Sequence, residues 1–343
     1  MRGNEKSQGE NRVLPLRKQK GSISPNLLVS IVTPSFNQEK YLEEAIRSVL
    51  AQDYSNVEYM VMDGGSTDDS VEVIQRYADR LAHWESQPDR GQAHAINKGL
   101  LQAKGDIMGW LNSDDVLLPS TVTDMVKAFE QHPEVGVVYG KLERIDARGG
   151  KIPTPILPKD RVEFSKEYVV DECLVNQPGS FWRRRIMEKA GMLDERLVYA
   201  LDYELWIRMV LSGARFLHLP QVVAQFRLSE DSKTVSRSAT MAQEQLNVLD
   251  MLLAQSDLAE KLELSERQLR QRLSKARANI SLHAFYGYWK SHRWAEARYW
   301  LFRALRYRPI VLFQRRWLDL MGASLARRLN IHGVSMKSEA DGR

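Results

Sequence analysis

The stretch LLVSIVTPSFNQEKYLEEAIRSVLAQDYSNVEYMVMDGGSTDD, residues 27–69, decides the fold class. Its first six residues are mostly apolar, which is the pattern of a strand buried on both faces. From residue 39 to residue 52 the apolar side chains recur at helical spacing, and residues 57–62 form a second apolar run. Strand, helix and strand within so short a stretch predict a parallel β-α-β unit.

The same alternation of strand and helix continues to residue 139. It indicates an α/β fold with a doubly wound, mostly parallel, Rossmann-like sheet. Ligands of such sheets bind beyond the carboxyl ends of the strands, where this chain has the turns TPSFN, DGGSTDD, PDRGQ and NSDD. We predict a helix around residues 71–77, a strand at 83–86, a helix at 92–103, a strand at 106–111, a helix at 120–131 and a strand at 135–139.

The chain is predicted to have three parts. Residues 1–26 are polar and without periodicity, which predicts a disordered tail. Residues 27–235 are predicted as the α/β domain, with a regular half at 27–140 and a less regular half at 141–235, where we expect a strand at 179–185 and a helix at 202–211. Residues 236–343 predict an all-helical basic extension, in which Ser265 and Gln268 fit a capping box at a helix start.

The composition excludes several classes of protein. With 343 residues, 43% of them hydrophobic and 27% charged, the chain is neither disordered throughout nor fibrous. Its single cysteine, Cys173, allows no intrachain disulfide and no cysteine-based zinc site, and it favours a reducing compartment. We find no secretory signal and no apolar run long enough to span a membrane. The prediction is a cytoplasmic protein.

The net charge of +5 is unevenly distributed. Residues 261–330, the basic tail, contain 16 Lys and Arg against 4 Asp and Glu, a net charge of +12, which leaves −7 for the rest of the chain. The acidic part of the chain, outside residues 261–330, suggests a metal or a sugar as ligand, and the basic tail suggests an anionic surface. Tryptophan and arginine interleave in this tail, so two interpretations stay open: helix packing with a solvated basic face, or peripheral docking on an anionic membrane leaflet. Nucleic acid is not predicted as a partner, because only this charge would support it.

Three acidic segments carry the candidate chemistry. The acidic turn Asn112-Ser113-Asp114-Asp115 ends a predicted buried strand, and repulsion between its adjacent carboxylates favours a bound cation, for which oxygen ligands suit Mg²⁺ or Mn²⁺. Asp63 ends the second strand and can accept hydrogen bonds from a base or a ribose. Asp202 lies near a predicted helix start and can act as general base for a sugar hydroxyl. In each segment the alternative is an aspartate that only caps the following helix.

Taken together, five segments resemble the family 2 glycosyltransferases in order and spacing: SIVTPSFNQEKYLEEAIRSVLAQDY, EYMVMDGGSTDDS, DRGQAHAINKGL, GDIMGWLNSDDVLLP and LDYELWIR. The resemblance covers residues 27–234, and NQPGSFWRR from residue 176 is similar to the acceptor-side strand of bacterial members. It implies an inverting enzyme with the nucleotide-diphosphosugar transferase fold, termed GT-A. Such an enzyme moves a sugar from a nucleotide-diphosphate sugar to an acceptor hydroxyl.

The resemblance also implies roles for residues on the donor side. Pro34 and Phe36 would flank the nucleobase, and Asp63 would bond the edge of the base or the ribose. Asp68 is a weaker candidate for the same ligand. Arg90 would approach the diphosphate.

The same resemblance implies which residues bind the metal and which residue acts as the general base. Asn112 and Asp114 match the first and last positions of the family's Asp-x-Asp motif, so Asp114 would bind Mn²⁺ or Mg²⁺ and Asn112 would bond the ribose. Asp115 would lie near the donor sugar or next to the metal. Asp202 matches the catalytic base.

The chain departs from the family pattern in two places. Asn112 replaces the first aspartate of the Asp-x-Asp motif, and Ser229 stands where many members have the histidine of an Arg-x-His motif. The Gln-x-x-Arg-Trp motif of processive polysaccharide synthases is absent after Asp202, which favours transfer of a single sugar. The implied acceptor is a glycan or lipid-linked glycan in cell-surface polysaccharide assembly.

Two other functions stay open at this point. A sugar-1-phosphate nucleotidyltransferase would share the sheet and the metal, but TPSFN replaces the Gly-rich, Arg-containing loop expected after its first strand. A catalytically degenerate scaffold is the non-enzymatic alternative, and the presence of Asp63, Asp114 and Asp202 argues against it. A dinucleotide oxidoreductase is excluded, because no Gly-x-Gly-x-x-Gly follows the first strand.

Overall fold

The computed structural model describes residues 27–153, 163–164, 175–229 and 238–309. The chain divides into two compact units, Met1–Leu269 and Arg270–Arg343, and each is described by itself. The predicted disordered tail at residues 1–26 and Cys173 lie outside the described residues. No helix in the described part of the chain is both long and apolar enough to cross a membrane.

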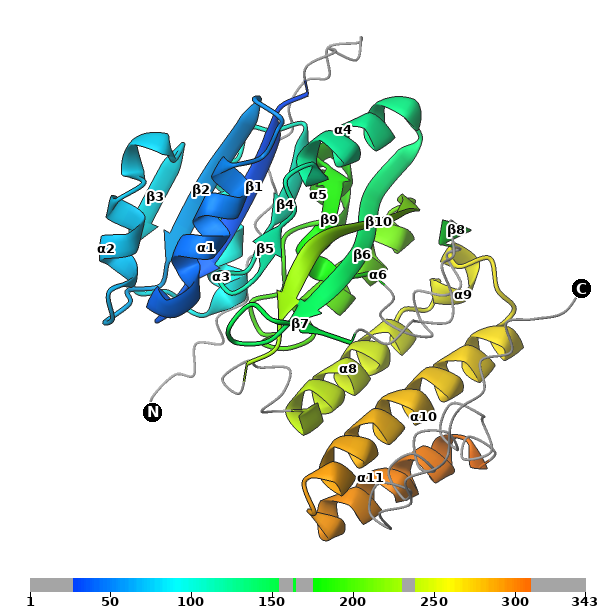
Figure 1. Ribbon diagram of the computed structural model, residues 1–343. Coiled ribbons are helices and arrows are strands. Elements are labelled where there is room, and N and C mark those ends of the chain that lie inside the picture. The colour runs from blue at the N-terminus through cyan, green and yellow to red at the C-terminus, as the bar shows by residue number, and fades with distance from the viewer. Residues whose placement is uncertain (1–26, 154–162, 165–174, 230–237, 310–343) are drawn as a thin grey trace, which may run out of the picture. The chain divides into compact units, whose positions relative to one another are not determined.

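One sheet organises the first unit, with the strand order β3-β2-β1-β4-β9-β6-β10-β5 (Figure 1). Neighbouring strands from β3 to β4 pair in parallel, as do β6 and β10, whereas β9 runs antiparallel between β4 and β6. The predicted α/β class with a mostly parallel sheet is confirmed. The strands are β1 Val29–Ser35, β2 Val57–Asp63, β3 His83–Ser86, β4 Ile107–Trp110, β5 Val116–Leu117, β6 Val135–Ile145, β7 Lys151–Ile152, β8 Glu163–Phe164, β9 Ser180–Arg183 and β10 Arg215–Arg227.

Helices cover both faces of this sheet (Figure 1). Ile31 of β1 belongs to the core shared with α1 and α4, whereas a Cβ added to Gly99 of α3 would lie 2.5 Å from Val32 Cγ1. Since side chains alternate along a strand, this two-sided cover explains why β1 is apolar at consecutive positions. The helices of this unit include α1 Glu39–Leu50, α2 Ser70–Gln75, α3 Gln92–Gln102, α4 Thr121–Gln131, α5 Arg184–Ala190, α6 Leu201–Leu211, α8 Ser238–Leu253 and α9 Leu258–Lys261.

The strand register sets the position of the turns. Ser35 at the end of β1 pairs with Asp63 at the end of β2, and Asp63 pairs with Ser86 at the end of β3. Val32 pairs with Trp110, so the acidic turn that follows β4 reaches the same edge. The turns after these four strands therefore share one edge of the sheet, as the sequence predicts.

The less regular half contains both of its predicted elements and four that were not predicted, namely β7, β8, α5 and β10. The predicted strand at 179–185 is β9, but it ends at Arg183, and Arg184 and Arg185 begin the helix α5. The predicted helix at 202–211 is α6. The strand β10 was not predicted, and its pairing with β6 has register shifts that interrupt a simple pattern. The helix predicted around 71–77 ends at Gln75.

The second unit contains most of α10 (Glu266–Lys290) and α11 (Trp294–Tyr307). The two helices are tied together where Ser274 Oγ donates to the Tyr307 carbonyl, and Trp289 meets Trp294 edge to face at 5.1 Å. Tyr299 and Phe302 of α11 are 56% and 67% exposed. This helix therefore presents aromatic rings to solvent.

The predicted capping box at the start of α10 is confirmed. Ser265 N–H donates to Gln268 Oε1 at 2.9 Å, and Gln268 N–H donates back to Ser265 Oγ at 3.3 Å. The two side chains thus satisfy backbone donors that a helix start leaves unpaired.

Candidate active site

The turns after β1 and β2 are hydrogen-bonded to each other. Asn37 N–H donates to Ser66 Oγ at 2.8 Å, and Thr67 N–H donates to Asn37 Oδ1 at 2.9 Å. Gly65 has a φ of +84°, a conformation that favours glycine. The two turns therefore form one rigid rim at the edge of the sheet.

Asp63 lies inside this rim and is fully buried. Its Oδ2 accepts hydrogen bonds from the backbone of Gly65 (3.0 Å) and Ser66 (2.9 Å) and from Ser86 Oγ (2.7 Å), while Oδ1 accepts from Ser66 Oγ. The carboxylate thus shapes its own turn. A contact of Asp63 with base or ribose, as predicted from the sequence, would share these oxygens with the turn.

Asp68 connects the starts of two helices. Its Oδ2 accepts from Glu39 N–H and its Oδ1 from Ser70 N–H, both at 3.1 Å. Burial acts to raise the pKa of Asp68, but the hydrogen bonds from Ser70 and Glu39 outweigh it and the pKa is lowered. The structure gives Asp68 this capping contact, and its predicted ligand role would come in addition.

Pro34 and Phe36 bracket the end of β1 differently. Pro34 is buried within the strand, whereas Phe36 is 59% exposed beside the rim. An exposed phenylalanine at the ligand edge of an α/β sheet leaves its ring open for stacking.

Arg90 follows β3 and forms an ion pair with Glu195, with Nε 3.0 Å from Oε2. Asn97 Nδ2 donates to the other oxygen of Glu195 at 3.2 Å. Burial acts to raise the pKa of Glu195, but the hydrogen bonds from Arg90 and Asn97 outweigh it and lower the pKa. The predicted contact of Arg90 with a diphosphate would require its guanidinium to share or exchange this partner.

The acidic turn, residues 112–115, is held by a polar network. Asn112 Oδ1 accepts from Gln92 Nε2 at 2.8 Å, and Asn112 Nδ2 donates to Gln177 Oε1 at 2.9 Å and to Asp115 Oδ2 at 3.2 Å. Gln177 in turn donates to the Trp110 carbonyl at 2.8 Å. The amide that replaces the first aspartate of the motif is thus bonded at both ends by the protein.

Arg227 lies beneath the acidic turn and is 1% exposed. Its backbone N–H donates to Asp115 Oδ1 at 3.1 Å, and its Nε donates to the Asp114 carbonyl at 2.9 Å. The guanidinium also pairs with Glu44 and lies 4.7 Å above the ring of Tyr41. This one side chain therefore binds the turn to α1.

The two carboxylates of the turn differ in environment. Asp115 is fully buried and Asp114 is partly exposed. Burial, and after it the charge of Asp114, raises the pKa of Asp115 well above its usual range. A cation bound at the turn would relieve this repulsion, and the more accessible Asp114 is the carboxylate that could reach it.

A metal at this edge could not rely on a cage of protein ligands. The described residues contain no cluster of three or more His, Cys, Asp or Glu that could hold an ion. Mg²⁺ and similar ions are commonly held by one or two carboxylates together with substrate phosphates. The oxygen donors of the acidic turn fit that mode of binding.

Asp202 is partly exposed in the first turn of α6. Its Oδ1 accepts from Tyr203 N–H at 2.7 Å. Burial raises the pKa of Asp202 to about 6, and the hydrogen bond from Tyr203 only partly opposes this. A carboxylate with this pKa is ionised at neutral pH and can accept a proton, which suits a general base.

Three buried indole rings connect Asp202 to the acidic turn. Trp206, one helical turn after Asp202, stacks on Trp110 with centroids 5.9 Å apart and an interplanar angle of 6°. Trp182 of β9 meets both rings edge to face, at 5.4 and 5.7 Å. Trp110 precedes Asn112 by two residues, so this tryptophan cluster fixes α6 against the strand that carries the acidic turn.

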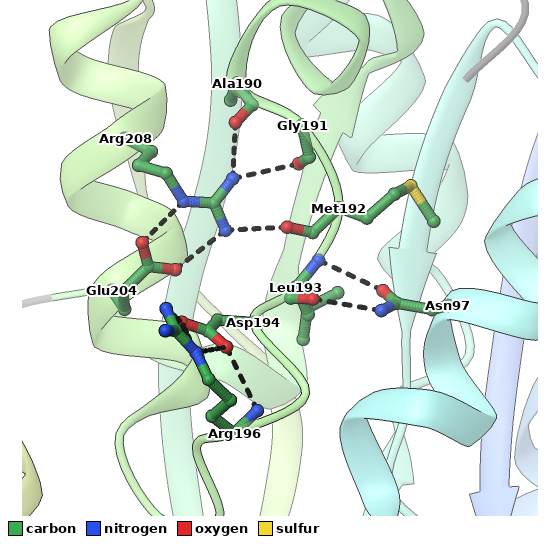
Figure 2. Close-up of polar contacts among 9 residues, drawn as sticks. All are labelled: Asn97, Ala190, Gly191, Met192, Leu193, Asp194, Arg196, Glu204 and Arg208. Carbon is green, nitrogen blue, oxygen red and sulfur yellow. Dashed lines mark hydrogen bonds and ion pairs between the residues drawn. The ribbon is translucent and has the colours of Figure 1, made fainter. Parts of the chain in front are cut away.

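A second network holds the segment that leads into α6 (Figure 2). Arg208 makes a two-point ion pair with Glu204, at 2.6 and 2.7 Å, and donates to the carbonyls of Ala190, Gly191 (3.1 Å) and Met192 (2.8 Å). Asn97 exchanges two hydrogen bonds with the Leu193 backbone, both at 3.0 Å. Both α6 and α3 therefore anchor this segment.

Several polar residues of these networks were not anticipated from the sequence. Gln92 and Gln177 stand in the segments DRGQ and NQPGS, whose resemblance to the family was the available signal. Glu44 and Arg208 lie within helices, where the sequence does not distinguish a charged side chain that makes a tertiary contact from one that is solvated. Only the fold shows that Glu44 pairs with Arg227, which bonds the acidic turn, and that Arg208 bonds the segment before α6.

Comparisons with known proteins identify relatives of this chain among glycosyltransferases. The family model described as "Glycosyl transferase family 2" matches residues 30–189. An uncharacterized glycosyltransferase of Mycobacterium tuberculosis is 31% identical over 189 residues, which cover 53% of this chain and 69% of the relative. An uncharacterized glycosyltransferase of Rickettsia conorii is 27% identical over 245 residues, which cover 68% of this chain; the match spans only 39% of that relative's length.

Two solved structures share the fold. TarS of S. aureus (residues 1–349, in complex with UDP-GlcNAc) has a TM-score of 0.58 at 17% identity, covering 80% of this chain and 90% of TarS. A mannosyltransferase of Pyrobaculum calidifontis, in complex with GDP-Man and Mn²⁺, has a TM-score of 0.56 at 18% identity and covers 92% of both chains. At these identities the likeness shows the GT-A fold alone.

We expect Asp202→Asn to stabilise the protein more at alkaline than at acidic pH. The native pKa of about 6 exceeds the ordinary value of 3.8, so the native state binds the proton more tightly than the unfolded state. The contribution of Asp202 to stability is therefore present below pH 3.8 and lost as pH rises through about 6. Urea unfolding should show a gain that is on the order of 1–2 kcal/mol larger at pH 8 than at pH 4.5.

The exposed Asp79 provides a matched control. Asp79→Asn should change the free energy of unfolding by no more than about 0.5 kcal/mol at either pH. An Asp202→Asn gain that is equal at pH 8 and pH 4.5 would contradict the raised pKa.

Proposed function

Because this chain belongs to the family 2 glycosyltransferases, we propose that it transfers one sugar from a nucleotide-diphosphate sugar to an acceptor hydroxyl with inversion at the anomeric carbon. The acceptor oxygen attacks that carbon, the bond from the carbon to the diphosphate oxygen breaks, and the nucleoside diphosphate leaves. The hydroxyl proton passes to Asp202. One displacement of this kind needs no covalent sugar–enzyme intermediate.

The observation that carries the proposal is the connection of Asp202 to the acidic turn through stacked Trp206 and Trp110. A displacement needs a base on one side of the reacting carbon and a stabilised leaving group on the other. The tryptophan cluster holds candidates for both in one rigid frame. The pKa of about 6 at Asp202 supports the role of the base at neutral pH.

The donor would bind at the shared edge of β1 to β4. We assign the nucleobase to the region of Pro34 and Phe36. Asp63 would bond the edge of the nucleobase or the ribose, with Asp68 as a weaker candidate for the same contact. Asn112 would bond the ribose, and Arg90 would approach the diphosphate. The exposed ring of Phe36 and the exposed guanidinium of Arg90 support these assignments. A screen of nucleotide sugars by thermal shift would identify the base and the sugar, since ligand binding raises apparent stability.

Mn²⁺ or Mg²⁺ would be held by Asp114, with Asp115 beside it, and by the donor diphosphate. When bound, such an ion supplies Lewis-acid stabilisation of the departing diphosphate. The oxygen donor set of the acidic turn supports this assignment, as does the Mn²⁺ in the structure of the P. calidifontis mannosyltransferase, a protein of the same fold. Asn112 and Arg227 would keep the turn in place around it.

We further propose that the acceptor is a glycan or lipid-linked glycan of cell-surface polysaccharide assembly, and that the protein works in the cytoplasm at the inner face of the membrane. The basic tail would attach it to anionic lipid. Exposed Arg298 and Arg306 lie on α11 together with exposed Tyr299 and Phe302. Basic and aromatic side chains on one helix suit the surface of an anionic leaflet.

Asp202→Asn should lower turnover by roughly 100-fold or more, the usual scale for loss of a general base, while donor affinity measured by calorimetry is retained. In the unsubstituted enzyme, kcat/KM should fall as pH drops below about 6, because Asp202 becomes protonated. Asp79→Asn should keep full activity. Near-normal turnover of Asp202→Asn, or loss of donor binding, would remove the base role.

Chelation tests whether the transfer reaction requires a divalent metal ion. EDTA should abolish transfer, and Mn²⁺ or Mg²⁺ should restore it, because the leaving diphosphate then regains its counter-charge. Asp114→Asn should raise the Mn²⁺ concentration needed for half-maximal activity. Full activity in EDTA would remove the proposed metal site.

Vesicle sedimentation tests whether the protein binds an anionic membrane surface. The full chain should pellet with anionic but not neutral vesicles and should be released by high salt, because each basic residue near an anionic leaflet contributes about 1 kcal/mol that salt screens. The variant R298E/R306E should pellet less than R47E/R148E, which changes the same charge at exposed positions of the first unit. A full chain that stays in the supernatant at low salt would refute the docking.

A further inference from the structure

Glu244 of α8 binds the backbone just ahead of α6. Its carboxylate accepts hydrogen bonds from the N–H groups of Val198 (3.1 and 3.2 Å to the two oxygens), Tyr199 (2.7 Å) and Ala200 (3.0 Å). Glu244 lies outside residues 30–189, which the family model matches, and beyond the catalytic domain predicted from the sequence. The structure nevertheless joins it to the segment that leads to Asp202.

This contact supplies what the local sequence lacks. The residue that precedes α6 is Ala200, which provides no side-chain cap, and alanine is among the poorest residues at that position. Consecutive backbone N–H groups that converge on one point form a concavity for an anion. Glu244 fills that concavity with a carboxylate from another helix.

The contact also determines which donors remain for Asp202, two residues after Ala200. A carboxylate at a helix start is drawn to free N–H groups. Glu244 occupies those of residues 198–200, and the Asp202 side chain accepts from Tyr203 N–H through Oδ1 and from its own backbone N–H. Its Oδ2 accepts no hydrogen bond from any other residue that the structure describes, and the side chain is partly exposed, so an acceptor hydroxyl could reach it.

The segment is thus fixed at two places by residues that would not touch the substrate. Arg208 and Asn97 hold residues 190–193, and Glu244 holds residues 198–200. The neighbouring Gln243 bonds Asn247 within α8 instead, at 2.8 Å. Of these two neighbouring side chains, Glu244 is the one that bonds residues 198–200, just before α6.

We propose that Glu244 is a positioning residue for Asp202: it fixes the backbone before α6 so that Oδ2 of Asp202 faces the acceptor hydroxyl. This inference rests on the proposed function of Asp202. It makes α8 part of the catalytic machinery, although α8 lies in the helical extension predicted from the sequence.

The test compares Glu244→Gln, Glu244→Asp and the control Glu260→Gln in the full chain. Glu260 is an exposed glutamate of α9 with no role in the site. Glutamine keeps the size of the side chain but places an NH₂ group against backbone donors, so Glu244→Gln should lower kcat at least about tenfold, because small misplacements of a catalytic group are costly. The KM for the donor should stay within about twofold. Glu244→Asp, which keeps the charge, should recover part of kcat, and Glu260→Gln should match the unsubstituted enzyme.

A double variant shows whether Glu244 acts through Asp202. In the Asp202→Asn background, Glu244→Gln should lower the remaining kcat by less than about twofold, because the group that it positions is already gone. A further tenfold loss there, a normal kcat in the single variant, or a parallel loss of kcat and donor affinity would overturn the positioning role.

Hydrogen exchange separates failure of this inference from failure of the proposed function. Amides of residues 198–203 should exchange faster in Glu244→Gln than in Glu260→Gln, whether or not a donor is known. Unchanged exchange refutes the inference and leaves the transferase proposal standing. Absence of sugar transfer from every donor tested, together with faster exchange, refutes the transferase proposal and with it the assigned purpose of the contact.

Discussion

The stack of Trp206 on Trp110 is the interaction on which the rest of the site depends. One ring belongs to the strand that leads into the acidic turn, and the other belongs to the helix that carries Asp202 in its first turn. Both rings are at most 3% exposed, and Trp182 closes the cluster from β9. Close-packed interiors tolerate little displacement. The relative position of a donor-side turn and an acceptor-side helix is therefore set by the core rather than by loops.

Around that frame, most polar atoms of the site are already bonded by the protein. Asp63 holds its own turn, Asn112 is bonded at both ends, and Asp68 caps two helices. Groups that are fixed before the ligand arrives need little reorganisation during the reaction. The groups that solvent reaches are few: the exposed ring of Phe36 and the partly exposed carboxylates of Asp114 and Asp202. These are the groups through which we propose that the substrate is engaged.

The sequence predicts the parts of this structure that depend on local pattern. Strand and helix spacing yields the sheet, and the positions of Asp63, Asp114 and Asp202 at element ends follow from it. Contacts between distant segments could not be predicted in this way. The pairing of buried Arg227 with Glu44 joins residues 183 positions apart, and Glu244 reaches residues 44 to 46 positions earlier in the chain. The strand β10 was missed for a related reason, since its register shifts disrupt the alternation that marks a strand.

The antiparallel strand β9 has a consequence for how the chain folds. β4 and β6 are complete once synthesis reaches Ile145, but in the native order each borders β9, which ends only at Arg183. Until then both strands have an unpaired edge, and such edges are templates for aggregation. Pairing across so many residues also slows folding. The regular half at residues 27–140 therefore cannot complete its sheet until β9 of the less regular half is available.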